Sequence, residues 1–149
     1  MSFDVAAGPF HHPGCLGCGT DNPRSLGVRM HPDGERMVGR VRFDEDREGA
    51  PGFVHGGAVA TVLDEVLGTV PLLLGRPAVT ANLNIDFRAP VLIGAEVEAT
   101  AWLVRAEGRK FFVAGELREG ETLLAEATGL FLEMPPEHYA RGAEAVGRW

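Results

Sequence analysis

The chain has 149 residues, of which 45% are hydrophobic and 23% charged, and its net charge is −7 at neutral pH. This length fits one globular domain, and the composition excludes a disordered or fibrous protein. The negative charge argues against a nucleic-acid surface, because phosphate binding requires clustered lysine and arginine. Two cysteines are too few for a disulfide framework, and the first 12 residues lack the basic and apolar segments of a secretory signal. We therefore expect one domain, residues 1–149, in a cytoplasmic protein.

Glycine and proline divide the first half of the chain into distinct segments. Residues 1–32 are dense in turn-forming residues and predict a loop-rich leader that packs on the domain. Residues 36–43 alternate imperfectly and indicate a strand. From 57 to 74, apolar residues recur at spacings of three and four, which predicts one deeply buried helix. Asp64 and Glu65 interrupt this run and would be costly inside a bilayer, so we expect no membrane span.

After the helix, the period of hydrophobicity changes to two. Apolar and polar residues alternate strictly over residues 79–88, which predicts a half-buried strand. Three more strands are predicted at residues 97–103, 110–117 and 122–133, and their short turns make them antiparallel neighbours. Residues 134–149 show no clear pattern and predict an irregular tail. One helix flanked by about five to six antiparallel strands gives an α+β architecture.

The strongest local signal for chemistry is the segment PGFVHGG at residues 51–57, directly before the buried helix. Its glycines let the backbone approach a ligand closely, and a helix start presents unpaired N–H groups and partial positive charge. The Gly57 amide could therefore stabilise an oxyanion, while Gly56 and Gly57 would also suit a simple tight turn. Asp64 favours a catalytic role for this segment over a simple turn, because an ionised carboxylate is not buried unpaired in an apolar helix. Glu65 better fits a solvent-facing or ion-paired residue.

Gly57 and Asp64 are seven positions apart, so they share one helix face at a separation of about 10 Å along the axis. A single carbonyl cannot lie about 3 Å from both groups at that separation. If both residues act on one substrate, they most simply come from two chains, which gives two equivalent sites per dimer. We therefore expect a homodimer, or a dimer of dimers.

The chain resembles the acyl-CoA thioesterases of the hotdog fold in its segment GAPGFVHGGAVATVLDEVLG. The likeness is greatest to the thioesterase superfamily member enzymes and their bacterial phenylacetate-pathway relatives, the PaaI-like group. The stretches TANLNIDFRAP, AEGRKFFVAGEL and LAEATGLF agree in order and spacing. The resemblance implies a long central helix wrapped by a curved antiparallel sheet, and dimers with composite sites. It also implies hydrolysis of acyl-CoA or other acyl thioesters, and no cofactor is expected.

The resemblance implies roles for four residues of this chain. The Gly57 amide matches the oxyanion donor, His55 a positioning or polarising group, and Asp64 a carboxylate that activates water or attacks the thioester. Thr80 matches a Ser/Thr that helps to place the water. This chemistry is consistent, since a carboxylate can serve as base or nucleophile, although His55 could instead be structural. Some relatives carry an asparagine where this chain has Gly49, which removes one carbonyl contact.

Coenzyme A would bring several negative charges to the protein. We expect a rim of cations for its phosphates at strand ends and at one turn, because clustered charge is what phosphate recognition needs. Each of these cations alone would be an ordinary surface charge. The expected rim consists of Arg88, Arg105, Arg109 and Lys110. Gly56 and Asn82 are also expected to contact the substrate.

Cys15 and Cys18 form a CxxC pair in the leader, close in sequence to His11, His12 and His31. A zinc site would need four converging ligands, and a redox motif would need a helix start after a strand. Neither context is visible in the sequence, so we interpret the pair as two buried thiols and expect no metal. A similar CxxCG followed by Asn-Pro opens many bacterial relatives, which suggests a leader that packs over the fold or the site.

Two functions compete for this sequence. The first is hydrolysis of acyl-CoA thioesters, and the second is non-catalytic binding of acyl or polyketide ligands by the same fold. Asp64 favours the enzyme, because a binder needs no carboxylate on a buried helix. A hotdog hydratase or dehydratase would require an Asp and His pair in a different arrangement, which we do not find.

Overall fold

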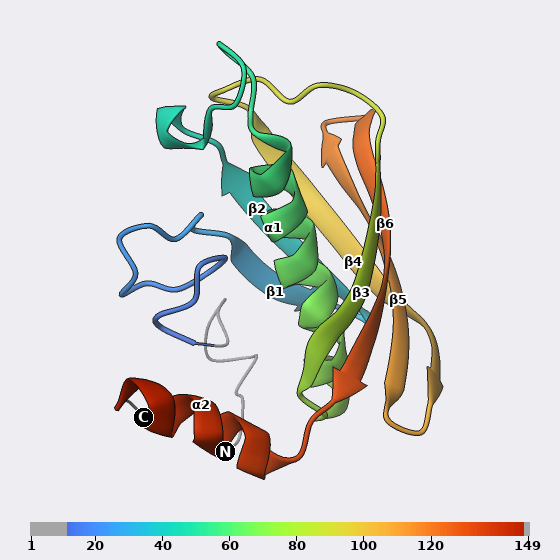
Figure 1. Cartoon of the computed structure of the whole chain (residues 1–149). Helices are drawn as coiled ribbons and strands as arrows, with labels where there is room; N and C mark the ends of the chain where they lie inside the picture. The colour runs from blue at the N-terminus through green and yellow to red at the C-terminus, as the bar shows by residue number, and fades with distance from the viewer. Residues whose placement is uncertain (1–11, 148–149) are drawn as a thin grey trace.

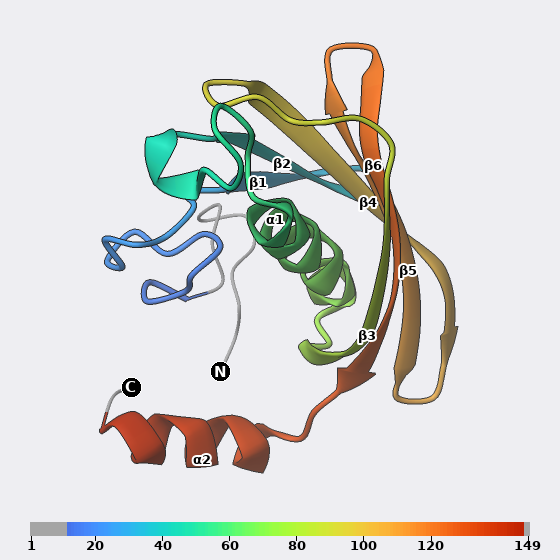
Figure 2. The same ribbon diagram turned by 45° about the horizontal axis from the view of Figure 1, so that its top comes forward.

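A computed structural model describes residues 12–147 of the chain (Figure 1). One antiparallel sheet has the strand order β1-β2-β4-β5-β6-β3, and it curves around helix α1 (Gly56–Gly68) (Figures 1 and 2). This is the α+β hotdog fold that the sequence predicts. The strands are β1 (Arg29–Asp33), β2 (Arg36–Arg42), β3 (Ala78–Phe87), β4 (Glu96–Glu107), β5 (Lys110–Glu119) and β6 (Thr122–Glu133).

Helix α1 forms the centre of the core. Its apolar face packs against the concave side of the sheet, where Phe43, Phe111 and Phe131 are fully buried. The α-helix ends at Gly68, earlier than predicted, and a 3-10 helix, η2 (Val70–Leu74), follows. Proline at position 71 explains the change, since it lacks the N–H that an α-helix would need. The buried residues of α1 follow the predicted spacing and are Val59, Val62, Val66, Leu63 and Leu67.

The segment Gly56–Leu74 is long and apolar enough to cross a membrane by length and composition alone. Half of its most apolar window (50%) is buried inside the fold. The segment therefore serves as the core helix of the sheet in this structure, which supports the expectation that it does not span a membrane.

Strand β3 lies at the edge of the sheet and pairs with β6 alone. A β-bulge between Thr80 and Asn82 breaks the strict alternation that the sequence predicts. A bulge adds one residue and so changes which side chains share a face. Thr80 therefore faces α1 together with Leu83 and Ile85, which pack on the core. The prediction of a half-buried strand is wrong for the single chain, because most β3 side chains are exposed at this uncovered edge.

The described part of the leader confirms that it packs on the domain, because Cys18 and Val28 are fully buried. Its last residues are not a loop, however, but strand β1, which pairs with β2. The turn between these strands contains Gly34 with φ of +59°. Asp33 pairs with Arg36, so Gly34 is the first of two turn residues, where a positive φ favours glycine.

The predicted irregular tail is wrong, because helix α2 spans Pro136–Val146. Pro136 at the first turn suits a helix start, since its missing N–H is not needed there. The helix extends beyond the end of β6 (Figure 2) and buries no residue fully. Its sequence, PEHYARGAEAV, contains few large apolar residues, which explains why the search for an apolar pattern did not reveal it.

Candidate active site

The loop before α1 is fixed by backbone hydrogen bonds, in which Val54 N donates to Val91 O and His55 N to Arg47 O, both at 2.8 Å. His55 is the N-cap of the helix, and its Nδ1 accepts a hydrogen bond from the Gly57 N–H at 2.8 Å. The neutral ring then carries its proton on Nε2. The predicted oxyanion donor is therefore present at the helix start, and in this structure its acceptor is the imidazole of His55.

Gly49 and Gly56 surround this helix start. A Cβ at Gly49 would lie 3.0 Å from the His55 Cα, so a side chain at this position would fit only if the loop shifted slightly. The departure from the asparagine of relatives thus coincides with a tight backbone contact. A Cβ at Gly56 would lie 3.7 Å from the Phe87 ring, an ordinary contact. The aromatic ring at the end of β3 therefore lies next to the helix start.

Asp64 lies on α1, seven positions after Gly57, and is half-buried. The Thr80 hydroxyl donates a hydrogen bond to its Oδ1 at 2.7 Å. Both residues line a pocket of about 310 Å³ between α1, η2, β3 and α2. The hydrogen bond fixes one carboxylate oxygen, and the other can receive a proton from water or attack a carbonyl carbon. Within one chain, Asp64 and Gly57 remain about 10 Å apart along the helix, as the sequence predicts.

Tyr139 of α2 also lines this pocket and was missed by the sequence analysis. Its hydroxyl oxygen is buried and makes no hydrogen bond within the described part of the chain. Burial raises the pKa of Tyr139, and the negative charge of Glu133 adds to the shift. The phenol therefore stays protonated at neutral pH. It is the only tyrosine of the chain, but its position in an apparently irregular tail gave no functional signal.

Asn82 does not face the pocket. Its side chain is exposed and accepts a hydrogen bond from Asn84 Nδ2 at 2.6 Å. Both asparagines lie on the outer face of β3, opposite Leu83 and Ile85, which pack on the core. The bulge after Thr80 separates the two predicted site residues onto opposite faces, so Asn82 does not join Thr80 at the pocket of this chain, and its contact with the substrate stays a prediction.

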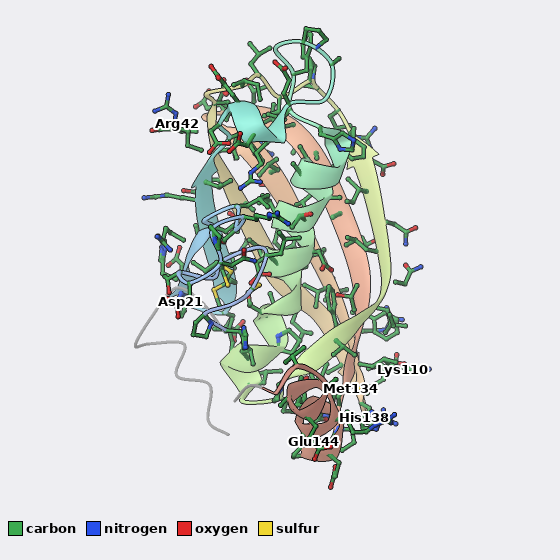
Figure 3. All side chains as sticks on the ribbon, turned by 60° about the vertical axis from the view of Figure 1, so that its left-hand side comes forward. Asp21, Arg42, Lys110, Met134, His138 and Glu144 are labelled. Atoms are coloured by element: carbon green, nitrogen blue, oxygen red, sulfur yellow. The ribbon has the colours of Figure 1, made fainter. Side chains whose placement is uncertain are left out.

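The four cations of the predicted rim do not all lie together. The Arg88 N–H donates to Leu124 O, whereas Lys110 pairs with Leu132, eight positions further along β6. At about 3.3 Å per residue, these two cations lie roughly 27 Å apart. Figure 3 shows Lys110 near the end of the molecule that carries α2. Arg88 therefore stands alone at one end, and the other end carries Arg105, Arg109 and Lys110.

A different group of arginines lines a groove of about 590 Å³ over β1, β2 and β4. Val41 and Val97, which alternate with the groove residues, point into the core. The groove thus lies on the outer face of the sheet, away from α1 and Asp64. Glutamates accompany the arginines, and Arg40 pairs with Glu98 at 2.8 Å. The arginines are Arg29, Arg40, Arg42 and Arg118.

Glu65 contacts the leader. The Cys15 thiol donates to Glu65 Oε2 at 3.3 Å, and the Oε1 atom is buried. Of the two predicted settings, facing solvent or ion-paired, the buried Oε1 atom excludes the first. Neighbouring residues on an α-helix point about 100° apart. Asp64 is directed to β3 and Glu65 towards the leader, which lies on the opposite side of α1 from β3 (Figures 1 and 2), although both carboxylates line the same pocket.

Known proteins are similar to this chain in sequence and in fold. A family model described as the thioesterase superfamily matches residues 51–126. The mouse acyl-coenzyme A thioesterase THEM4 is 44% identical over 92 residues, which cover 60% of this chain and 40% of that protein. The chain thus spans less than half the length of that relative.

Solved structures show the same fold. A crystal structure described as a thioesterase superfamily protein is 27% identical, with a TM-score of 0.78, and the match covers 89% of this chain and 66% of that chain. The Escherichia coli PaaI protein from the phenylacetic acid degradation operon has a TM-score of 0.71 at 19% identity, over 78% of this chain and 88% of that chain. At that identity the likeness concerns the fold alone.

Proposed function

Because this chain belongs to the thioesterase superfamily, we propose that it hydrolyses acyl-CoA thioesters to a free acid and coenzyme A. The observation that carries the proposal is the Asp64 carboxylate, which the Thr80 hydroxyl holds at 2.7 Å on the wall of a pocket. The name of the mouse relative, acyl-coenzyme A thioesterase, gives independent support. A protein that only binds acyl groups has no use for an oriented carboxylate there.

In the proposed reaction, Asp64 acts as a general base or as a nucleophile. As a base, it takes a proton from water, and the water oxygen bonds to the thioester carbon. The C–S electron pair then returns to sulfur, which leaves as a thiol after it receives the proton. As a nucleophile, the carboxylate attacks the thioester carbon, the C–S bond breaks, and the coenzyme A thiolate leaves a mixed anhydride. Water then hydrolyses the anhydride, which releases the acid, regenerates the Asp64 carboxylate and supplies the proton that the thiolate takes up. In both routes the oxyanion accepts the Gly57 N–H and replaces the Nδ1 of His55 as its acceptor.

The proposal includes a homodimer in which Gly57 and Asp64 of one site come from different chains. Their separation of about 10 Å on one helix requires a second chain if both act on one carbonyl. The unpaired edge of β3 offers a surface for that chain, because it exposes Val79 (39%) and Phe87 (55%). Phe87 lies beside Gly56 at the helix start. A partner on this edge would therefore adjoin the site.

The decisive experiment measures coenzyme A release from a panel of acyl-CoAs of different chain length and aromatic character. Asp64→Asn should lower turnover by at least about a hundredfold while ligand binding and folding persist, because general acid–base catalysis contributes about 10²–10⁴ in rate. Asp33→Asn, at the exposed end of β1, is the matched control and should keep full activity. Saturable binding without turnover by the unmodified protein would instead establish the acyl-binding alternative.

A further inference from the structure

The leader and helix α1 bring together three metal-ligating side chains to which the proposed thioesterase reaction gives no role, although one of them, Glu65, also lines the pocket of Asp64. The ligand atoms of Cys15, Cys18 and Glu65 all lie within 4.8 Å of one another. Cys18 is buried and Cys15 half-buried. We propose that these residues form a structural Zn²⁺ site that ties the leader to α1.

The spacing of the ligand atoms suits tetrahedral zinc. Typical Zn–S distances of about 2.3 Å and Zn–O distances of about 2.0 Å place neighbouring sulfur and oxygen ligands about 3.5 Å apart. Cys15 Sγ and Glu65 Oε2 are 3.3 Å apart. Two thiolates with one carboxylate also favour zinc over magnesium or calcium, which prefer oxygen ligands alone.

Backbone hydrogen bonds of the CxxC loop fix the position of the Cys15 sulfur. The Gly17 N–H donates to Cys15 Sγ at 3.3 Å, and Gly19 N closes the turn on Cys15 O at 2.9 Å. A Cβ at Gly17 would lie 2.4 Å from Glu65 Oε2. The absence of a side chain at Gly17 therefore lets the carboxylate reach the two cysteines.

Zinc binding would change the charge of the cluster. Both thiols would lose their protons to become ligands, and the cation would then offset the charges of two thiolates and one carboxylate. His12 is not a further ligand in this geometry, because its Nδ1 accepts the Gly14 N–H at 2.9 Å and its Nε2 then carries the proton. The fourth position is assigned to water.

From the sequence we expected no metal, because it shows no set of four converging ligands around the two cysteines. Glu65 supplies the missing ligand from a position 50 residues after Cys15. It directly follows Asp64, so the metal would fix the part of α1 that carries the proposed catalytic carboxylate. The site itself does not depend on the thioesterase proposal, and its test needs no turnover.

The test uses the full chain, reduced and stripped of metal with a chelator. Zn²⁺ is titrated in competition with a chromogenic chelator, and Co²⁺ is used as a spectroscopic probe. We expect one zinc per chain and, with Co²⁺, the charge-transfer band of cobalt–sulfur bonds together with the visible bands of tetrahedral coordination. Cys15→Ser and Cys18→Ser should each lower zinc affinity at least about a hundredfold, since even indirect contacts contribute 10–100-fold.

Glu65→Gln should weaken zinc binding and keep the cobalt–sulfur band, whereas Glu137→Gln, on exposed α2, should change neither. The proposal is overturned if the unmodified reduced protein binds no stoichiometric zinc or shows no cobalt–sulfur band. Zinc affinity that is unchanged in the double variant Cys15→Ser/Cys18→Ser would also overturn it. The result on the unmodified protein decides the question even where a variant fails to fold, which circular dichroism monitors.

Discussion

Replacing Thr80 by valine removes the hydrogen bond to Asp64 with little change in side-chain shape. The bond joins a neutral hydroxyl to a carboxylate at 2.7 Å, and hydrogen bonds to charged groups contribute about 1.5–3 kcal/mol. Each 1.36 kcal/mol of barrier is a tenfold change in rate, so complete loss of this contribution lowers kcat by roughly 10- to 150-fold. The KM should change little, because the hydroxyl orients the carboxylate rather than the acyl group.

The assay is the initial rate of coenzyme A release over a range of concentrations of the best substrate, which separates kcat from KM. Thr80→Ser restores the hydroxyl and should recover most of the rate. Thr128→Val, at an exposed position of β6, is the matched control. A Thr80→Val protein within twofold of the unmodified kcat would refute the orienting role. A rise in KM with kcat unchanged would assign Thr80 to substrate binding instead.

The remaining predictions test the dimer, the pocket, the metal and one ion pair. Refolding a mixture of Gly57→Pro and Asp64→Asn chains should restore about a quarter of the active sites, and no recovery in verified heterodimers would contradict the composite site. Tyr139→Phe should raise the free energy of unfolding in urea by up to about 1 kcal/mol, because it removes a buried hydroxyl that has no hydrogen-bond partner among residues 12–147; a comparable loss would mean that the hydroxyl is bonded. Zinc at a hundred times its Kd should raise the free energy of unfolding by about 2.7 kcal/mol. Calorimetry should show this as a rise of roughly 5–10 °C in Tm, and equal Tm values with and without zinc would exclude a structural role. A hydrogen bond from Arg76 lowers the pKa of Glu133 below its ordinary value of 4.5. The stability that this ion pair contributes is therefore fully present above pH 4.5, and it is lost as the pH falls through the lowered pKa of Glu133. The Tm difference between the unmodified chain and Glu133→Gln should therefore shrink in acid, and a difference independent of pH would contradict this.

The elements that the sequence predicts well are those whose pattern is set locally. The core helix and the strands β4, β5 and β6 have sustained periodicity and glycine turns, such as those at Gly108 and Gly120, where φ is +57°. The bulge in β3 could not be predicted, because the alternation of residue types continues through Ala81 without a break. Its position depends on pairing with β6, which is not a local property.

The candidate site divides in the same way. His55, Gly57 and Asp64 belong to one contiguous motif and were predicted together with their separation. Thr80 was predicted only through the family resemblance, and its contact with Asp64 depends on how β3 packs beside α1. Tyr139 reaches the pocket from a helix at the other end of the chain. Residues that converge from distant segments leave no spacing in the sequence that could reveal them.

Asp64 and Glu65 show how far residue type alone can mislead. Both are carboxylates at neighbouring positions on the same apolar helix, and the sequence predicts a catalytic role for Asp64 and a solvent-facing or ion-paired setting for Glu65. The two side chains point about 100° apart, so that the Thr80 hydroxyl of β3 bonds to the first and the Cys15 thiol to the second, while both line the pocket. Helix α1 is thus connected on one side to the pocket and on the other to the leader. A metal bound at Glu65 would act on the helix backbone one residue away from the proposed catalytic carboxylate, so losing the metal should also loosen the geometry of the thioesterase site.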